Sequence, residues 1–545
     1  MRKRPFTNLN GWHLLAGAAS GLLLFLSFPP AGLYPLAWVA AVPVLWLAAR
    51  EPRKSLLPGY VAGAIFFLAG LEWIRHATIA GMVLLGLFLG LYVAAFAFAA
   101  GLLRTRLRVP LAIAAPAVWV ALEAVRSNVM TGFPYLLLGH SQINILPLMQ
   151  ILDLTGVYGV SFIVMSANGL LAEIILARRS SEPRRFLYPI ISAAIVALCV
   201  AGSLIYGHHR LATLQTRPGP EVCLVQANIP QDVKNSVSYE QAVDMLVKHL
   251  RLTSDGLTAA GYRTGEKPPP LVIWPETAVL CAYNNTRDPW TVEVRGNLNE
   301  VLFKELNVKT LLLGVEMIDT AGPEPKRFNS AVCIRGNCND YQRYDKIHLV
   351  PFGEYIPLSS LLFFLKTVVP VGSLPYSHGR DCTLLDYQGQ KLGVVICYED
   401  VFPGIVRRFV ATGAGCIVNI SNEGWFFNSA EADQHLAIAR CRAIENRVGL
   451  VRATNSGISC LIDPAGRIEK VLERGGRVKM VQGWLAGQVT TGARNALYTR
   501  IGDLFAIACI GLSTAMLGIV GVRAWRARPP ANRSSKPKQR NRNRR

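Results

Sequence analysis

Long apolar runs at the two ends of the chain constrain its fold more than any other feature. Apolar residues crowd into residues 11–206 and 502–521, whereas residues 207–500 have the mixed composition of a globular domain. A membrane-spanning helix needs about 20 predominantly apolar residues. Segments near that length are residues 11–29, 31–49, 58–74, 79–103, 109–123, 159–177, 187–206 and 502–521. We therefore predict a membrane all-α bundle of eight transmembrane helices, seven before the globular part and one after it.

Two apolar stretches are weaker than the others. Residues 109–123 are a short run with two prolines and a glutamate, and residues 134–151 are broken by two prolines. Proline disrupts a helix interior, so only the first stretch is counted as a span and the second is expected to be a loop or re-entrant piece. The first segment, residues 11–29, follows a basic start as a signal peptide would. No small-residue cleavage site precedes the next apolar run, so it is expected to remain as an anchor.

Positive charge is distributed unevenly around the apolar segments. The chain has 57 Lys and Arg against 35 Asp and Glu, a net charge of +22. The basic clusters lie at residues 2–4, 50–54, 104–108, 178–185 and 523–545. All of them fall on one side of the membrane if the N-terminus is cytoplasmic and all eight segments span, which is the arrangement that the positive-inside rule favours. Both termini are therefore predicted to be cytoplasmic, with residues 207–500 on the other side.

These boundaries divide the chain into four parts. Residues 1–206 are predicted to be a membrane domain with seven transmembrane helices, residues 207–500 the globular domain, residues 501–522 the eighth transmembrane helix, and residues 523–545 a basic disordered cytoplasmic tail. The tail is also similar in composition to a nucleic-acid-binding arm. Its place directly after a membrane helix favours the anchor, and no nucleic-acid partner is expected.

The eleven cysteines do not form a metal-binding pattern. There is no C-x-x-C pair and no Cys/His group at zinc spacing, so no metal is expected. Cys333 and Cys338 flank a turn-like stretch, and both a disulfide and two free thiols remain open for them, with free thiols the commoner outcome.

From Glu221 onward, short β-branched runs alternate with helical stretches. Strands are expected at residues 222–227, 271–274, 310–315, 331–334, 342–345, 392–397, 416–420, 450–454 and 459–462, and helices at 239–254, 297–306 and 430–446. This alternation favours a layered α/β domain. The sequence has no glycine-rich phosphate loop and no G-x-S-x-G motif, which disfavours a serine hydrolase with a nucleophile elbow.

Three reactive side chains each lie close after an apolar strand. Glu276 is a candidate general base, Lys346 a candidate cation for an oxyanion, and Cys397 a candidate nucleophile. A reactive cysteine must become a thiolate and so needs a cationic or basic neighbour. Taken singly, each residue has a commoner structural interpretation: a surface glutamate, a solvated lysine beside a carboxylate, and an inert core cysteine.

Together the three segments resemble the nitrilase (carbon–nitrogen hydrolase) superfamily, whose catalytic residues are Glu, Lys and Cys in that chain order. The resemblance covers nearly all of residues 220–490 and includes motifs at residues 421–426, 434–435 and 452–457. It implies an α/β domain built as an αββα sandwich. Cys397 would be its nucleophile, Glu276 its general base, and Lys346 its oxyanion-stabilising cation.

The same resemblance implies roles for four neighbouring residues. Glu354 would hold the lysine in place. Tyr398 and Glu399 would shape the pocket beside the nucleophile, and Trp425 would lie on a loop over the site. Residues 358–376 are an apolar insert directly after the lysine loop, and an interfacial arm that dips into the outer leaflet is expected there rather than buried core.

The seven spans before the domain, the one after it, and the run His348-Leu-Val-Pro-Phe-Gly-Glu-Tyr-Ile-Pro357 also resemble the apolipoprotein N-acyltransferase family. That resemblance implies an inner-membrane enzyme with a periplasmic catalytic domain. It would transfer a fatty acyl chain from a phospholipid to the N-terminal amine of diacylglyceryl-cysteine in an apolipoprotein, through a thioester on Cys397. No cofactor is implied, because the acyl group arrives as an ester, and a monomer is expected.

Two other functions are compatible with parts of the sequence. A membrane-tethered nitrilase-type amidase could use the same three residues on small amides, but it would need neither the apolar insert nor seven spans. A transporter with an added periplasmic domain would be expected to bury more charges in its spans. Glu72 and Glu123 are the main charges there.

Overall fold

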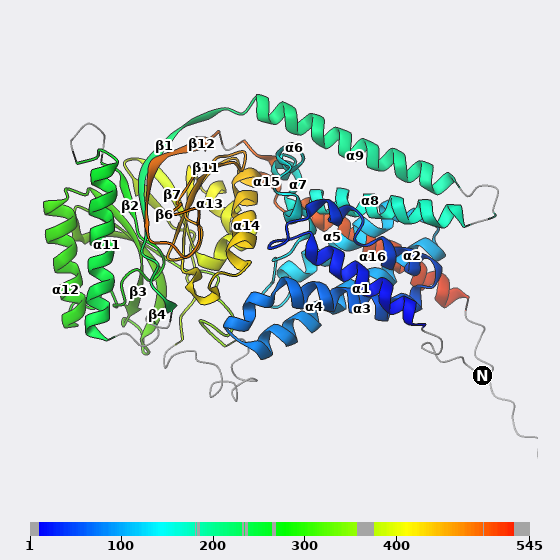
Figure 1. Ribbon diagram of the computed structural model, residues 1–545, viewed down its shortest axis with the longest axis horizontal. Helices are drawn as coiled ribbons and strands as arrows, with labels where there is room; N and C mark the ends of the chain where they lie inside the picture. The colour runs from blue at the N-terminus through cyan, green and yellow to red at the C-terminus, as the bar shows by residue number, and fades with distance from the viewer. Residues whose placement is uncertain are drawn as a thin grey trace, which may run out of the picture.

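The structure, a computed structural model, has a helical half and an α/β half that lie side by side (Figure 1). It describes residues 10–179, 181, 186–231, 234, 238–263, 269–356, 375–493 and 495–527. The predicted tail, apart from residues 523–527, and the predicted arm at 358–376, apart from its last two residues, lie outside this described part of the chain.

The helical half is built from the apolar segments. Its main helices are α1 (Gly11–Leu26), α2 (Val42–Arg50), α3 (Leu56–Gly70), α4 (Ile79–Arg106), α5 (Leu111–Asn128), α8 (Val157–Arg178), α9 (Leu187–Ala212) and α16 (Leu504–Arg526). Within the described residues, four of these are long and apolar enough to cross a membrane: α4, α8, α9 and α16. The prediction of a membrane protein is therefore supported. Four of the eight predicted spans correspond to helices of sufficient length and apolarity, and the other four are not shown to be spans.

Proline explains why one predicted helix is divided. The expected helix at residues 31–49 is split into η1 (Tyr34–Trp38) and α2, and Pro35 and Pro43 each stand in the first turn of a new helix. A proline fits that position because its missing N–H has no partner there in any case.

Residues 134–151, which were expected to be a loop or re-entrant piece, form only short helices. These are η4 (Leu138–Gln142) and α6 (Leu146–Met149), and α7 (Leu152–Thr155) follows directly. The stretch between α3 and α4 also forms a short helix, η3 (Glu72–His76). Most of residues 133–153 are buried against the rest of the protein. The stretch has no helix of spanning length among the described residues, and its being a loop or re-entrant piece stays a prediction.

The α/β half contains two six-stranded sheets. The first has the order β12-β1-β2-β3-β4-β5 and the second β11-β10-β9-β8-β7-β6. In the first sheet the strands are β1 (Thr216–Gln226), β2 (Leu271–Ile273), β3 (Thr310–Asp319), β4 (Lys326–Arg335), β5 (Asn337–Asp345) and β12 (Gly483–Gly492). In the second they are β6 (Leu384–Tyr387), β7 (Gln390–Ile396), β8 (Cys416–Ser421), β9 (Gly449–Thr454), β10 (Cys460–Ile462) and β11 (Ile468–Val471).

Helices cover the outer faces of the two sheets (Figure 1). The first sheet carries α11 (Tyr239–Ala259), α12 (Pro289–Asn297) and η5 (Leu298–Glu305), and the second carries α13 (Pro403–Ala411) and α14 (Glu431–Asn446). Strands β1 to β3 are mutually parallel, as are β7 to β9, and each is buried over most of its length, which explains their continuous apolar runs. The prediction of a layered α/β domain is confirmed.

All nine predicted strands are present, and three further strands were not predicted. The missed strands are β6, β11 and β12. Strand β12 contains three glycines, which weaken a strand signal, and β11 is largely exposed at a sheet edge. The helix α9 also continues to Ala212, beyond the predicted domain boundary at residue 206.

Cys333 and Cys338, for which the sequence allowed either a disulfide or two free thiols, are free thiols. Cys333 packs in the core between the sheets, whereas Cys338 packs on the opposite side of the first sheet, under α12. A disulfide between them would require their side chains to meet through the sheet.

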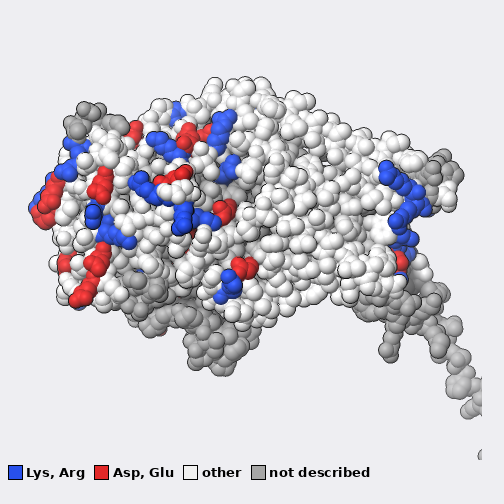
Figure 2. Space-filling view, viewed as in Figure 1, with Lys and Arg blue, Asp and Glu red and all other residues white. Residues whose placement is uncertain are grey.

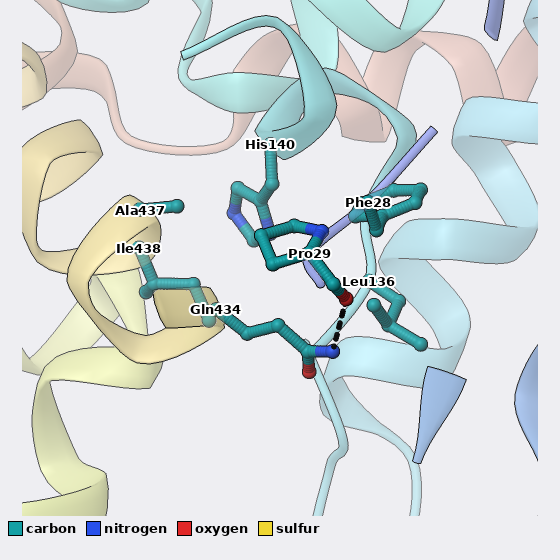
Figure 3. Close-up of a pocket in the computed structure, with 7 residues that line it drawn as sticks. All are labelled: Phe28, Pro29, Leu136, His140, Gln434, Ala437 and Ile438. Atoms are coloured by element: carbon teal, nitrogen blue, oxygen red, sulfur yellow. Dashed lines mark hydrogen bonds between the residues drawn. The ribbon is translucent and has the colours of Figure 1, made fainter. Parts of the chain in front are cut away.

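Helix α14 docks the α/β half onto the helical half. The Gln434 side chain accepts a hydrogen bond from the Trp73 indole (3.1 Å) and donates to the Pro29 carbonyl (3.3 Å). Arg447, just after α14, is buried against Asp153 of α7 (2.9 Å). Figure 3 shows a small apolar pocket at this seam, lined by Phe28, Pro29, Leu136, His140, Gln434, Ala437 and Ile438.

Candidate active site

The candidate nucleophile lies at a sharp turn after a buried strand. Cys397 follows β7 directly, opens the short helix η7 (Cys397–Val401), and has a φ of 53°. This left-handed conformation is unfavourable for a residue with a Cβ. The Asn419 side chain, from β8, donates to the Cys397 carbonyl (3.0 Å) and helps to hold the turn.

The surroundings of Cys397 favour the protonated thiol over the thiolate. Burial raises the pKa of Cys397 well above its usual value, and the nearby Glu276 carboxylate raises it further, whereas Lys346 lowers it. The first two effects are larger than the attraction of the lysine. If Cys397 is the nucleophile, a base must remove its proton, because a cationic neighbour alone is not enough.

Four side chains from the first sheet and its loops form the catalytic cluster. Its members are Glu276, Asn329, Lys346 and Glu354. The Lys346 Nζ lies 2.9 Å from Glu354 Oε1 and 3.3 Å from Glu276 Oε1, and it is almost completely buried. The second oxygen of Glu276 accepts from the backbone N–H of Asn422 (2.9 Å).

The two carboxylates keep the lysine charged. Burial alone would lower the pKa of Lys346, but Glu354 and then Glu276 raise it well above its usual value. The structure thus places the predicted Glu276, Lys346 and Glu354 together, with Cys397 within their electrostatic reach.

Glu399 fixes the lysine loop to the nucleophile turn. Its carboxylate accepts from the backbone N–H groups of Ile347 (2.7 Å) and Ile396 (2.8 Å), and from the Tyr344 phenol (2.8 Å). Burial raises the pKa of Glu399 to about 7. The carboxylate is buried among these donors and holds the two loops together, and its part in shaping the pocket beside the nucleophile stays a prediction.

Tyr398 and Trp425 lie toward the helical half. The Tyr398 ring stacks on Tyr135, with 6.0 Å between ring centroids and 11° between planes. Trp425 belongs to η8 (Glu423–Phe426) and is 43% exposed, while the next residue, Phe426, packs edge-on against Trp73 (4.7 Å). The loop that carries Trp425 therefore lies where the catalytic domain meets the helices.

A second set of buried charges lies on the other side of the nucleophile turn. This supporting cluster consists of Asp400, Glu423, Glu431, His435 and Arg452. The His435 ring lies 2.5 Å from Asp400 and 2.9 Å from Glu423, and Arg452 contacts both of these carboxylates. Burial would lower the pKa of His435, but Asp400 and the other contacts hold it well above its usual value.

The supporting cluster has the spacing of a metal site but already contains its own cations. Glu423, Glu431 and His435 place ligand atoms within 4.8 Å of one another. The Arg452 guanidinium lies against Glu423 and a protonated His435 lies between carboxylates, so positive charge is supplied by side chains. The arrangement is that of a paired ionic network.

Several residues that organise the site were not predicted. Asn329 donates from the middle of β4, and Lys234, whose pKa burial lowers to about 8, donates to the Thr277 carbonyl (3.1 Å) next to Glu276. A polar residue inside an otherwise buried strand was the one available signal for Asn329. His435 and Arg452 lie in motifs that the sequence analysis named, but nothing in the sequence indicated that both would contact Asp400 and Glu423.

Comparison with known proteins covers both halves of the chain. The family model described as "Apolipoprotein N-acyltransferase N-terminal domain" matches residues 20–170, and that described as "Carbon-nitrogen hydrolase" matches residues 221–477. A curated apolipoprotein N-acyltransferase from Geobacter metallireducens is 34% identical, over 94% of this chain and 95% of its own length. Those of Azotobacter vinelandii and Chlorobaculum tepidum are 32% and 30% identical, over 95% and 92% of this chain and 97% and 96% of theirs.

A solved amidase structure from Nesterenkonia sp. is also similar to the α/β half. It is 18% identical, with a TM-score of 0.34, and the alignment covers 53% of this chain and 95% of the amidase.

Proposed function

The chain belongs to the apolipoprotein N-acyltransferase family, and on that premise we propose that it moves a fatty acyl chain from a phospholipid to the N-terminal amine of diacylglyceryl-cysteine in an apolipoprotein. The relatives confirm the predicted family and the predicted class of enzyme, an acyltransferase that acts on lipoproteins. The observation that carries the mechanism is the contact of Lys346 with both Glu276 and Glu354 beside Cys397.

In the first half-reaction, the Cys397 sulfur attacks the carbonyl carbon of an acyl ester in the phospholipid. Glu276 accepts the thiol proton as the S–C bond forms. Lys346 has three N–H groups and uses two on its carboxylates, so the third is left for the developing oxyanion. When the C–O ester bond breaks, Glu276 returns the proton to the leaving oxygen, and a lysophospholipid departs from the thioester.

In the second half-reaction, the free amine of the apolipoprotein attacks the thioester carbon. Glu276 accepts the amine proton and Lys346 again faces the oxyanion. The C–S bond then breaks, the proton passes to the Cys397 sulfur, and an amide is released. The acyl group is activated as an ester from the start, so the reaction uses no metal and no nucleotide.

For the membrane part, we propose that the eight segments predicted from the sequence cross the inner membrane, with η1 and α2 together forming the second span. Basic side chains from different loops meet at one end of this half. Arg50 and Arg179 both lie over the Trp46 ring (4.9 and 5.2 Å), and Arg104 lies over Tyr188 (4.0 Å). Figure 2 shows blue residues at that end and a largely uncharged band next to them. The positive-inside rule makes this the cytoplasmic end and puts the catalytic domain in the periplasm.

The same topology brings the active site to the bilayer surface. Phe427 and Phe352, which flank the catalytic loops, are 56% and 44% exposed, and Phe427 contacts His76 at the end of η3 (5.1 Å). The enzyme would act as a monomer with a phospholipid and an apolipoprotein as its substrates.

Mass spectrometry of the intact protein tests the acyl-enzyme. After incubation with phospholipid, the protein should gain the mass of one acyl chain, and hydroxylamine should remove it. Cys397→Ala should form no adduct and should not N-acylate a lipoprotein, although it should fold normally. Cys382→Ala, which removes another partly exposed thiol, is the matched control. Normal N-acylation by Cys397→Ala would overturn the assignment.

Reporter fusions test the topology. A reporter that is active only in the periplasm should be active when fused at Gly265 and inactive when fused at Arg528. The opposite result at either site would mean that the number of spans is wrong.

A further inference from the structure

Asn329 connects the two carboxylates of the catalytic cluster. It lies on β4 and is 4% exposed. Its Nδ2 is 2.7 Å from Glu276 Oε1 and 2.8 Å from Glu354 Oε1, and its backbone carbonyl accepts from the Lys346 N–H (2.8 Å).

The orientation of this amide is fixed by its neighbours. An amide nitrogen has two N–H groups, and here each one has a carboxylate oxygen to bind. The opposite orientation would point Oδ1 at two carboxylates, which are acceptors only. In the described part of the chain, Oδ1 is buried without a hydrogen-bond partner. An unpaired buried acceptor lowers stability. The Asn329 amide is therefore oriented so that its two N–H groups bind the carboxylates, although its Oδ1 then has no partner and the folded state is less stable for it.

The hydrogen bonds to Glu276 leave one place for a proton. Each carboxylate oxygen has two lone-pair sites. Asn329 and Lys346 occupy both sites of Oε1, whereas the Asn422 N–H occupies one site of Oε2. The free acceptor of the catalytic base is therefore on Oε2.

We propose that Asn329 is a positioning residue for the acyl-transfer reaction: with Lys346 it saturates Oε1 of Glu276, so that the base takes the substrate proton on Oε2. This inference rests on the proposed function of Glu276 as the base. Asn329 itself touches no reacting atom.

The test measures how the reactivity of Cys397 depends on pH. The charged and titratable groups that act on Glu276 are Lys234, Lys346, Glu354, Tyr376 and Cys397, and all of them are kept in the variants below. Asn329→Leu removes both donors with little change in volume, and Asn329→Asp keeps the shape but substitutes a third carboxylate. The rate of iodoacetamide labelling of Cys397 and the rate of acyl-adduct formation are each followed from pH 6 to 10 on the full-length protein in detergent.

Both variants should shift the two profiles to higher pH. Without the amide donors, Glu276 is held less firmly as a base for the Cys397 thiol, and removal of the thiol proton depends more on hydroxide from the solvent, so a shift of about one pH unit is expected. That shift makes both reactions roughly tenfold slower near pH 7, with most of the loss recovered at high pH. Asn329→Asp should shift at least as far as Asn329→Leu.

The matched control is Asn284→Leu. Asn284 also donates from a partly buried amide to the backbone, at the Ile318 carbonyl (2.6 Å), but it lies outside the catalytic cluster. It should leave both profiles in place even if the protein melts at a lower temperature.

Two results would separate the possible failures. If both Asn329 variants kept the wild-type pH profile and lost only thermal stability, Asn329 would be structural and this inference wrong. If the wild-type protein formed no acyl adduct while its labelling profile still shifted on substitution of Asn329, the proposed function would fail and the positioning role would stand.

Discussion

The catalytic cluster and the supporting cluster are made of the same kinds of side chain, yet their surroundings give them different roles. The catalytic cluster has one cation for two carboxylates, and its base has a free acceptor near a thiol. The supporting cluster has two cations, His435 and Arg452, among three carboxylates, and all five side chains are buried. Oε2 of Glu423 and Oε2 of Glu431 in the supporting cluster also lack a hydrogen-bond partner among the described residues. We therefore propose that the position of Glu276 and Lys346 beside the Cys397 thiol, and not burial or a free acceptor alone, gives the catalytic cluster its role.

The largest expected effect separates the two catalytic roles within the first cluster. Lys346→Ala should form acyl adduct at least about a hundredfold more slowly, because the oxyanion loses its donor. Raising the pH should restore little. Glu276→Gln should also be inactive near neutral pH, but its rate should rise by about tenfold per pH unit, because solvent then removes the proton from a thiol of high pKa.

These rates are measured by mass spectrometry of the acyl adduct between pH 7 and 10. Lys304→Ala is the matched control, since Lys304 pairs with Glu300 at the surface. Accumulation of acyl-enzyme at the normal rate by Lys346→Ala would make that lysine structural and remove the distinction between the clusters.

The sequence predicted the catalytic cluster better than the supporting one, for a physical reason. Glu276 and Cys397 follow the buried apolar strands β2 and β7, whereas Lys346 directly follows β5, which is largely polar. The ends of these three strands meet in the structure. Asn329 lies within a strand, and its role depends on two loops that come from elsewhere in the chain.

The supporting cluster could not be assembled from the sequence. Its side chains come from η7, η8, α14 and β9, and only tertiary packing pairs them. The division of the expected helix at residues 31–49 had a local signal in Pro35 and Pro43. Strand β12 had no local signal of this kind, because it is paired with β1, which lies more than 250 residues away in the chain.

Breaking the supporting cluster should reduce stability more than chemistry. Arg452→Met removes a buried cation and leaves Asp400 and Glu423 with His435 alone. Losing one partner of a buried ion pair costs about 3–5 kcal/mol, so the detergent-solubilised protein should melt at a clearly lower temperature. The molecules that remain folded should form acyl adduct with an unchanged pH profile.

Arg467→Met is the matched control for this substitution. Arg467 pairs with Asp463 at 3.3 Å, but its side chain is 48% exposed, so its loss should cost less than about 1 kcal/mol. If Arg452→Met melted like the wild type, the supporting cluster would not contribute to stability as argued.

The smallest expected effect concerns the hydrogen bond that joins the supporting cluster to the helical half. The Tyr135 phenol, from the segment between α5 and η4, donates to Glu431 Oε1 (3.1 Å), and its ring stacks on Tyr398 beside the nucleophile. Tyr135→Phe keeps the ring and removes one buried hydrogen bond, so it should lower the free energy of unfolding by about 1 kcal/mol. Tyr239→Phe, which removes a phenol–carboxylate hydrogen bond to Glu293 at the surface, should change the free energy of unfolding by much less.

A double-mutant cycle of Tyr135→Phe with Glu431→Gln isolates the pair, and the second substitution should cost less once the first is present. The rate of acyl-adduct formation should change little in Tyr135→Phe, because no reacting atom is touched. A loss of adduct as complete as that of Lys346→Ala would mean that the supporting cluster takes part in the chemistry, and the contrast between the two clusters would no longer hold.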